Sequence, residues 1–253
     1  MSGNLAHDTA VLLQRSLRHV LRSPDTIVTT AVTPIAMLLL FVYVFGGALK
    51  AVDGSYVDYL LPGILLITIA SGIAYTAFRL FTDVSGGIVD RLRSMPIGRS
   101  ALLWGHVLTS LVANLASLVL VVLVALAMGF RSGAGVLAWL AVAGLLALVT
   151  LALTWIAVIP GLTAKSADGV SGFSYPLIFL PFVSSAFVPT AGMPGPVRWF
   201  AQHQPVTSIV NTIRDLYAGI PVGDQGWIAL AWCFGVLVVA YALAMGTYRR
   251  KFG

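Results

Sequence analysis

Residues 132–164 read SGAGVLAWLAVAGLLALVTLALTWIAVIPGLTA, and this stretch decides the class of fold. Its 33 residues include no acidic and no basic side chain. The hydrocarbon core of a bilayer takes roughly 20 residues of helix, so the stretch is long enough to cross it. Apolar residues fill it without the polar alternation of a membrane barrel strand. The stretch therefore predicts a transmembrane helix.

Five further stretches also lack Asp, Glu, Lys and Arg and are long enough to span. Only 9% of the 253 residues are charged, against about 25% in soluble proteins, which excludes a water-soluble domain. We therefore expect an all-α membrane protein with a transmembrane domain of six helices over residues 26–248. The five stretches are residues 26–49, 59–78, 100–130, 169–197 and 225–248.

The basic residues predict the orientation of these spans. A cytoplasmic N-terminus places eleven of the fifteen Lys and Arg residues inside, as the positive-inside rule requires, and the opposite orientation violates the rule. Both termini are therefore expected in the cytoplasm, with residues 249–253 as a basic tail. Because the positive charge lies in short clusters between apolar stretches, it indicates topology and no nucleic-acid partner.

Residues 1–25 predict an amphipathic helix that precedes the first span. Arg15, Arg18 and Arg22 share one face, opposite a face of leucine and valine. The basic face suits anionic lipid headgroups, and contact with a cytoplasmic partner is a second interpretation.

The fifth stretch contains five prolines, so we expect its helix to break near its outer end. After it, apolar residues recur with helical spacing over 206–217, between Pro205 and Gly219. Residues 194–219 are therefore expected to form short helices outside the membrane.

The loop between the second and third spans, residues 82–100, reads TDVSGGIVDRLRSMPIGRS. It predicts a short cytoplasmic helix over about 84–98. Gly87 gives the chain flexibility between this helix and the preceding span, and Pro96 ends the helix. An apolar ridge flanked by charges suits a cleft on another protein, and a helix lying on the lipid surface is the alternative. The ridge comprises Ile88, Leu92 and Met95, and the charged flanks are Asp90, Arg91 and Arg93.

Two blocks of sequence resemble the ABC-2 type permeases, and in particular the daunorubicin-resistance type. The first is GIVDRLRSMPIGRS at 87–100, which is similar to the coupling-helix region of that family. The second begins with SSAFVP at 184–189 and continues through MPG at 193–195, WFAQHQPV at 199–206 and Arg214. With the pattern of spans, the resemblance covers nearly the whole chain.

The resemblance implies a transmembrane permease subunit of an ATP-binding cassette exporter in a bacterial plasma membrane. Two copies of a separate ATPase bind ATP and Mg, and a second permease, identical or related, completes the pathway. The N-terminal basic helix then lies at the ATPase interface, and the outer helices cover the exit. The residues implied to couple the two subunits are Gly87, Ile88, Asp90, Arg91, Leu92, Arg93, Met95 and Pro96.

The source of energy is also constrained by the residues themselves. A P-loop needs a glycine before its Lys-Ser pair, and here Ala164 precedes Lys165 and Ser166. Proton-driven carriers place ionisable groups within their spans, and His106 is the one such residue in the six stretches. We therefore expect a non-catalytic chain, without cofactor or metal, that is driven by an external ATPase.

The cargo is less constrained. Aromatic residues in three of the predicted spans suit a path for a flat amphipathic drug or lipid-like molecule, and packing or interfacial anchoring is the alternative. Asn114 is expected to join helices, and Arg214 and Asp215 are expected in water. Competing functions are export of a polysaccharide or lipid-linked glycan, a lipid-modifying enzyme, and a non-transporting scaffold for an ATPase. The candidate pathway residues are Phe41, Tyr43, Phe45, Tyr75, Phe78, Phe179 and Phe182.

Overall fold

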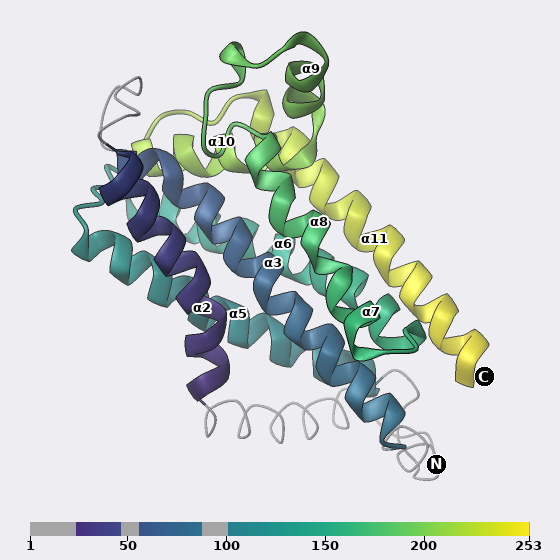
Figure 1. The fold of residues 1–253 in the computed structure, drawn as a ribbon. Coiled ribbons are helices and arrows are strands. Elements are labelled where there is room, and N and C mark those ends of the chain that lie inside the picture. Colours follow the sequence, from purple (N-terminus) through teal and green to yellow (C-terminus); the bar gives the residue numbers. More distant parts are fainter. Residues whose placement is uncertain (1–23, 47–55, 88–100, 253) are drawn as a thin grey trace.

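The computed structural model describes residues 24–46, 56–87 and 101–252, and every regular element within these ranges is a helix (Figure 1). The N-terminal helix predicted for residues 1–25 and the coupling residues 88–96 lie outside the described residues, apart from the start of α2. In chain order the elements are α2 (Pro24–Leu39), η1 (Leu40–Phe45), α3 (Tyr56–Ser85), α5 (Ala101–Ala127), α6 (Val136–Thr163), α7 (Ala167–Gly172), α8 (Ser174–Phe179), η2 (Leu180–Val183), η3 (Thr190–Gly192), α9 (Gly195–His203), α10 (Pro205–Ala218) and α11 (Asp224–Phe252).

Four of these helices, α3, α5, α6 and α11, are long and apolar enough to cross a membrane. They coincide with four of the six predicted spans. The first predicted span is represented by α2, which continues without interruption into the π-helical segment η1. The described residues therefore contain four full-length candidate spans and a shorter apolar helix.

The fifth stretch does not form one helix. It is divided into α7, α8 and the 3₁₀ segment η2, so it breaks after Phe179, which is further from its C-terminal end than the sequence predicts, and also near Gly172. Pro181 lies at the start of η2, where its missing N–H and fixed φ end the preceding α-helical pattern. Because the helix also breaks at its other end, it is less regular than the sequence predicts.

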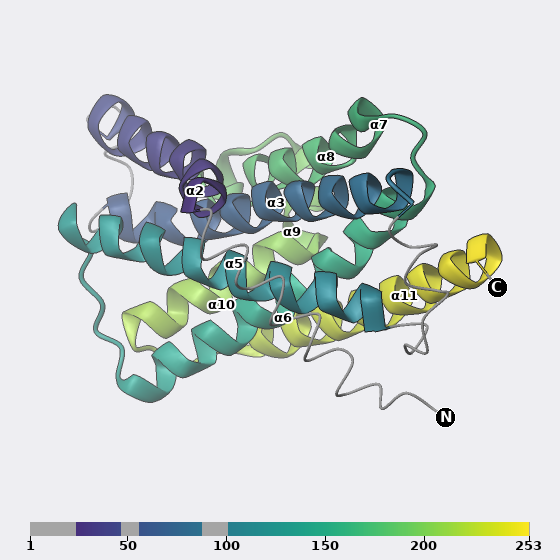
Figure 2. The same ribbon diagram turned by 90° about the horizontal axis from the view of Figure 1, so that it is seen from below.

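Helix α3 lies at the centre of the bundle. In its most apolar stretch 83% of the residues are buried, compared with 22% in α11. It packs against α2, α5, α6, α7, α8 and α10, and Figure 2 shows it between the α2/α8 side and the α6/α11 side. In that stretch α3 is also the least apolar of the four candidate spans, as suits a helix that faces other helices while its neighbours keep more of their surface exposed.

Glycines permit the closest helix contacts, as is usual where lipid gives no hydrophobic driving force for helix association. A Cβ atom at Gly161 of α6 would lie 3.0 Å from the carbonyl oxygen of Ala77 in α3. At Gly63 of α3 it would lie 2.7 Å from the Cβ of Ala186. Backbone therefore packs directly against neighbouring groups on two sides of α3.

Helices α9 and α10 lie across one end of the bundle, called here the α10 end (Figure 1). The opposite end carries Gly87 and the C-terminal turn of α11, and is called the loop end. Helix α10 begins at Pro205 and is capped by Gly219, which has φ +70°. It buries the predicted apolar face, including Ile209, Val210 and Ile213, against the bundle.

Candidate functional site

At the loop end, α3 ends where the predicted coupling segment begins. The N–H of Gly86 donates to the carbonyl oxygen of Thr82 at 2.8 Å, and the N–H of Gly87 donates to that of Val84 at 3.3 Å. Gly87 has φ +71°, in the left-handed region that favours glycine. Of the eight predicted coupling residues, Gly87 is the one that the structure describes, and it directs the chain out of α3.

An ion pair joins the two helices from which residues 88–100 extend. Nε2 of His106 in α5 lies 3.1 Å from Oδ2 of Asp83 in α3. The side chain of His106, the ionisable residue noted in the predicted spans, is largely buried. Its partner was missed, although both residues lie near the helix ends that flank one loop, and this shared position was an available signal.

An apolar cluster lies beside this ion pair. Leu80 of α3 and Leu103 of α5 are fully buried together with Trp155 of α6. The rings of Trp155 and Trp104 meet edge-on, with their centroids 5.1 Å apart. The cluster also includes residues of α11, so the ends of four helices form one packed unit at the loop end.

In the middle of the bundle, hydroxyl groups connect three helices. The Thr76 hydroxyl of α3 donates to Ser110 Oγ of α5 at 2.7 Å, and Ser110 Oγ lies 3.4 Å from Thr154 Oγ1 of α6. Asn114 donates to the carbonyl oxygen and the hydroxyl of Ser110 within its own helix. Ser110 is therefore the residue that bridges the helices, and Asn114 supports it.

At the α10 end, Arg214 forms a polar network that contradicts its expected exposure to water. Its guanidinium donates to the carbonyl oxygens of Tyr59 and Ser185 at 3.0 and 3.1 Å, and to Oδ1 of Asn211 at 3.1 Å. It also lies over the Tyr59 ring, 3.9 Å from the centroid. The Tyr59 hydroxyl in turn donates to the carbonyl oxygen of Ser185 at 2.9 Å.

Burial lowers the pKa of the Arg214 guanidinium, while the neighbouring Tyr59 and Asp215 act in the opposite direction. Arginine stays protonated in proteins, so the group remains a cation here. Its planar fork suits several oxygen acceptors and an aromatic face at once. Arg214 thus connects α10 to α3 and to the turn around Ser185. The sequence did not predict these contacts, because the partners lie far from Arg214 along the chain.

The structure separates the seven predicted pathway aromatics into groups. Ring contacts connect Phe41 to Phe45 and to Phe182, and Phe182 to Phe179, with centroids 5.6 to 6.5 Å apart. The sequence analysis missed Phe187, which is buried and stacks on Phe182 at 4.7 Å. The structure therefore places four of the predicted residues in one cluster between α2/η1 and α8/η2.

The other three predicted aromatics are not part of these contacts. Tyr43 is 71% exposed on η1. Tyr75 and Phe78 lie on α3, where Tyr75 is 12 residues beyond Gly63, the residue that packs against Phe187. This separation corresponds to about 18 Å along the helix, so the seven residues do not form a single site.

Within the described ranges, no three His, Cys, Asp or Glu side chains come together as metal ligands would. The polar arrangements that join helices instead include the Arg214 network and the Asp83–His106 pair. Both hold helices together by hydrogen bonds and charge.

Comparison with known proteins identifies the family. The family model described as "ABC-2 type transporter" matches residues 7–218. A daunorubicin resistance ABC transporter permease protein of Streptomyces coeruleorubidus is 28% identical, over 99% of this chain and 87% of the relative. A probable doxorubicin resistance ABC transporter permease protein of Mycobacterium tuberculosis is 27% identical, over 96% and 88%. A putative transport permease of Porphyra purpurea is 25% identical, over 86% and 76%.

The family match over residues 7–218 shows the family, and the four long apolar helices among the described residues agree with a membrane protein. The chain belongs to the ABC-2 type transporter family and is a multi-pass permease subunit of an ABC transporter.

Proposed function

We propose that this permease exports an amphipathic drug or a lipid-like molecule, driven by a separate ATPase that docks on residues 84–98. The observation that carries the proposal is that the two helices flanking this segment are firmly joined to each other. They are joined by the Asp83–His106 pair and by the apolar cluster beside it. Force applied to the loop is therefore transmitted to α3, the buried centre of the bundle.

The proposed membrane arrangement has six spans, with both termini in the cytoplasm of a bacterium. Helix α2 and η1 together give 22 residues, or about 33 Å, which suffices for one span. The broken chain of α7, α8 and η2 forms the fifth. The loop end then faces the ATPase, and α9 and α10 lie on the outer face.

The docking roles proposed from the sequence are retained. Ile88, Leu92 and Met95 enter an apolar cleft of the ATPase, and Asp90 and the arginines of the loop make charged contacts at its rim. Arg15, Arg18 and Arg22 lie at the same interface. Two ATPase copies and a second permease complete the assembly, because six spans supply half of a pathway of this type.

The proposed cargo contact is the cluster of Phe41, Phe45, Phe179 and Phe182. Aromatic side chains offer flat apolar surface to a planar cargo. Phe179 is 61% exposed, so the cluster reaches the surface of this subunit, where a second permease would face it. The two relatives named for daunorubicin and doxorubicin resistance support a drug as cargo.

Loop variants test the docking. Asp90→Lys and Leu92→Asp are expected to leave the protein in the membrane but to abolish copurification with the ATPase and ATP-dependent efflux. Asp168→Lys is a matched control, because Asp168 is exposed on α7 at the same end of the bundle. Normal copurification and efflux in both loop variants would refute the docking site.

Efflux assays with hydrophobic drugs, together with cell-envelope analysis of a deletion strain, test the cargo. Loss of drug efflux without an envelope change is the expected result. Phe182→Ala is expected to reduce drug efflux at least several-fold, and Phe234→Ala, on the exposed face of α11, serves as control. An altered envelope glycan with normal drug resistance would contradict the proposed cargo.

A further inference from the structure

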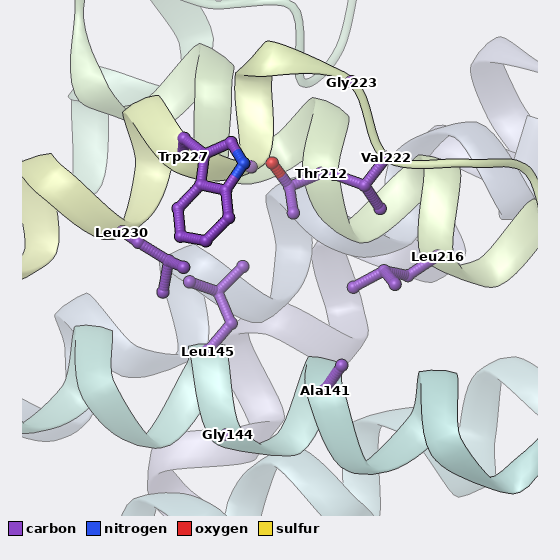
Figure 3. A pocket seen from close by; sticks show the side chains of 10 residues that line it. Ala141, Gly144, Leu145, Thr212, Leu216, Val222, Gly223, Trp227 and Leu230 are labelled. Carbon is purple, nitrogen blue, oxygen red and sulfur yellow. The ribbon is translucent and has the colours of Figure 1, made fainter.

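A cavity of about 500 Å³ lies between α6, α10 and α11 (Figure 3). These three helices lie on the other side of α3 from α2 and α8 (Figure 2). Its size falls within the roughly 300–1,000 Å³ typical of small-molecule sites. Figure 3 shows its side chains converging from α6 on one side and from α10 and α11 on the other. The lining residues are Ala141, Gly144, Leu145, Thr212, Leu216, Val222, Gly223, Gly226, Trp227 and Leu230.

The lining selects an apolar ligand. It contains no ionisable side chain. The Thr212 hydroxyl is buried, and its proton is donated to the carbonyl oxygen of Ser208 at 2.7 Å. A charged ligand would lose its hydration in this cavity with no opposite charge on the lining to compensate, at a cost of several kcal/mol. A hydrocarbon chain has no such hydration to lose.

The position of the cavity indicates where this hydrocarbon comes from. Ala141 and Gly144 follow the first residue of α6 by five and eight positions, which places them about 8–12 Å into the helix. The neighbouring surface of α6 is apolar and exposed, with Leu137 81% and Leu140 64% accessible. In a multi-pass membrane protein, such a surface at this depth faces lipid chains.

Trp227 lies beside the cavity near the start of α11 and is 77% exposed. Tryptophan concentrates at membrane interfaces, because its ring is apolar and its N–H is a hydrogen-bond donor. The residue thus places the cavity just below the headgroup level. An apolar space at this level, open beside a lipid-facing surface, is accessible to the chains of surrounding lipids.

Two glycines leave the space unfilled. A Cβ atom at Gly144 or at Gly223 would meet no atom within 4 Å. Glycine in a helix interior costs about 1 kcal/mol relative to alanine, so Gly144 weakens α6 at the floor of the cavity. A methyl group at either position would therefore displace no protein atom.

We infer that this cavity holds the acyl chain of a phospholipid from the leaflet at the α10 end, wedged between α6, α10 and α11. The chain completes the packing beneath α10 and holds this amphipathic helix on the bundle. This site is separate from the proposed cargo cluster, and it requires neither ATP nor transport.

Photocrosslinking tests the inference on the full-length protein. The purified permease is reconstituted in vesicles of phosphatidylethanolamine and phosphatidylglycerol that contain a phospholipid with a diazirine in its acyl chain. Wild-type protein is expected to give crosslinks in residues 136–145 and 222–230. Absence of crosslinks from these segments would refute the site.

Cavity-filling variants distinguish the site from general lipid contact. Gly144→Leu is expected to reduce these crosslinks about ten-fold, and Gly223→Leu provides a second, independent filling. Gly235→Leu is the matched control, because Gly235 lies in a helix interior with open space around its Cβ position. Unchanged crosslinking in the two cavity variants, or displacement of the lipid by a hydrophobic drug cargo, would overturn the inference.

Discussion

Gly72 sets the distance between α3 and α5 in the middle of the bundle. A Cβ atom at this position would lie 2.0 Å from Oδ1 of Asn114, which is 2% exposed. Such a contact is far shorter than two non-bonded atoms allow, so one of the helices or the amide would have to move. Small residues at helix interfaces in membranes commonly serve to permit such approach.

Gly72→Ala is therefore expected to destabilise the protein by about 1–3 kcal/mol, the usual cost of overpacking. Asn114→Ala removes the obstructing amide, so the double variant is expected to recover most of this loss. Unfolding in mixed detergent micelles measures all three variants. Gly235→Ala is the control, since Gly235 lies in a helix interior outside the cavity and its new methyl group meets no neighbouring atom. Additive losses in the double variant would contradict the steric explanation.

Arg214 provides a second prediction at this scale. Arg214→Lys keeps the charge but loses the planar fork that reaches Tyr59, Ser185 and Asn211 at once. Loss of hydrogen bonds to a charged group costs about 1.5–3 kcal/mol, so the thermal midpoint is expected to fall by several degrees. Arg131→Lys, at an exposed arginine on the same end, should leave it unchanged. Equal midpoints for the two variants would show that the network contributes little.

The distance of these partners along the chain explains why the sequence could not reveal the network. Arg214 lies 155 residues from Tyr59 and 29 residues from Ser185. A helical pattern predicts which face of α10 is apolar. Arg214 lies at the edge of that face, and the residues that contact it there depend on how other elements pack against α10. The predicted apolar face of α10 was therefore confirmed, while the environment predicted for Arg214 was wrong.

At the scale of elements, the ion pair between α3 and α5 is expected to affect coupling more than stability. As a hydrogen bond the Asp83–His106 pair contributes about 0.5–1.5 kcal/mol, so His106→Leu should fold and assemble nearly normally. Without the pair, motion of the loop reaches α3 less directly. The expected result is continued ATP hydrolysis by the assembled transporter, with several-fold less cargo moved per ATP.

His106→Gln is the matched control for this prediction, because an amide can still donate a hydrogen bond to Asp83. It should retain more coupling than His106→Leu at equal abundance in the membrane. If His106→Leu moves as much cargo per ATP hydrolysed as the wild type, the pair has a structural role and no role in coupling.

Long uncharged stretches were reliable predictors of elements because their length directly reflects the thickness of the bilayer. This explains why α3, α5, α6 and α11 were predicted. The fifth stretch was less predictable, since prolines indicate that a helix breaks but not how the chain then turns. The turn around residues 184–187 brings Phe187 onto Phe182, and a helical pattern does not predict such a turn, so Phe187 was missed. Tyr75 and Phe78 fall elsewhere because they lie 12 and 15 residues beyond Gly63 along α3.

At the scale of the whole molecule, the structure places residues 131–135 beside the end of α10. The Ser132 hydroxyl and the Gly133 N–H both donate to the carbonyl oxygen of Tyr217, at 3.0 and 3.1 Å. At the loop end, Lys251 of α11 donates to the carbonyl oxygen of Leu162 in α6. These contacts establish which segments share an end of the bundle, and the charge pattern predicts which end faces the cytoplasm.

Cysteine labelling of intact cells tests that orientation. In a background with Cys233→Ala, a membrane-impermeant maleimide is expected to label Gly135→Cys from outside and Lys165→Cys only after permeabilisation. Both positions are exposed, so access to each depends on the membrane and not on burial. The reverse pattern would place the proposed docking loop outside the cell and exclude coupling to a cytoplasmic ATPase.

The dimensions of α3 have a mechanical consequence. Its 30 residues make a rod about 45 Å long, held near one tip by Asp83 and near the other by Tyr59. Tilting such a rod by about 5° around its midpoint would shift the two tips by about 2 Å in opposite directions. If the ATPase docks at the loop end as proposed, α3 would act as a lever that carries a small push there to Arg214 and α10 at the other end of the bundle.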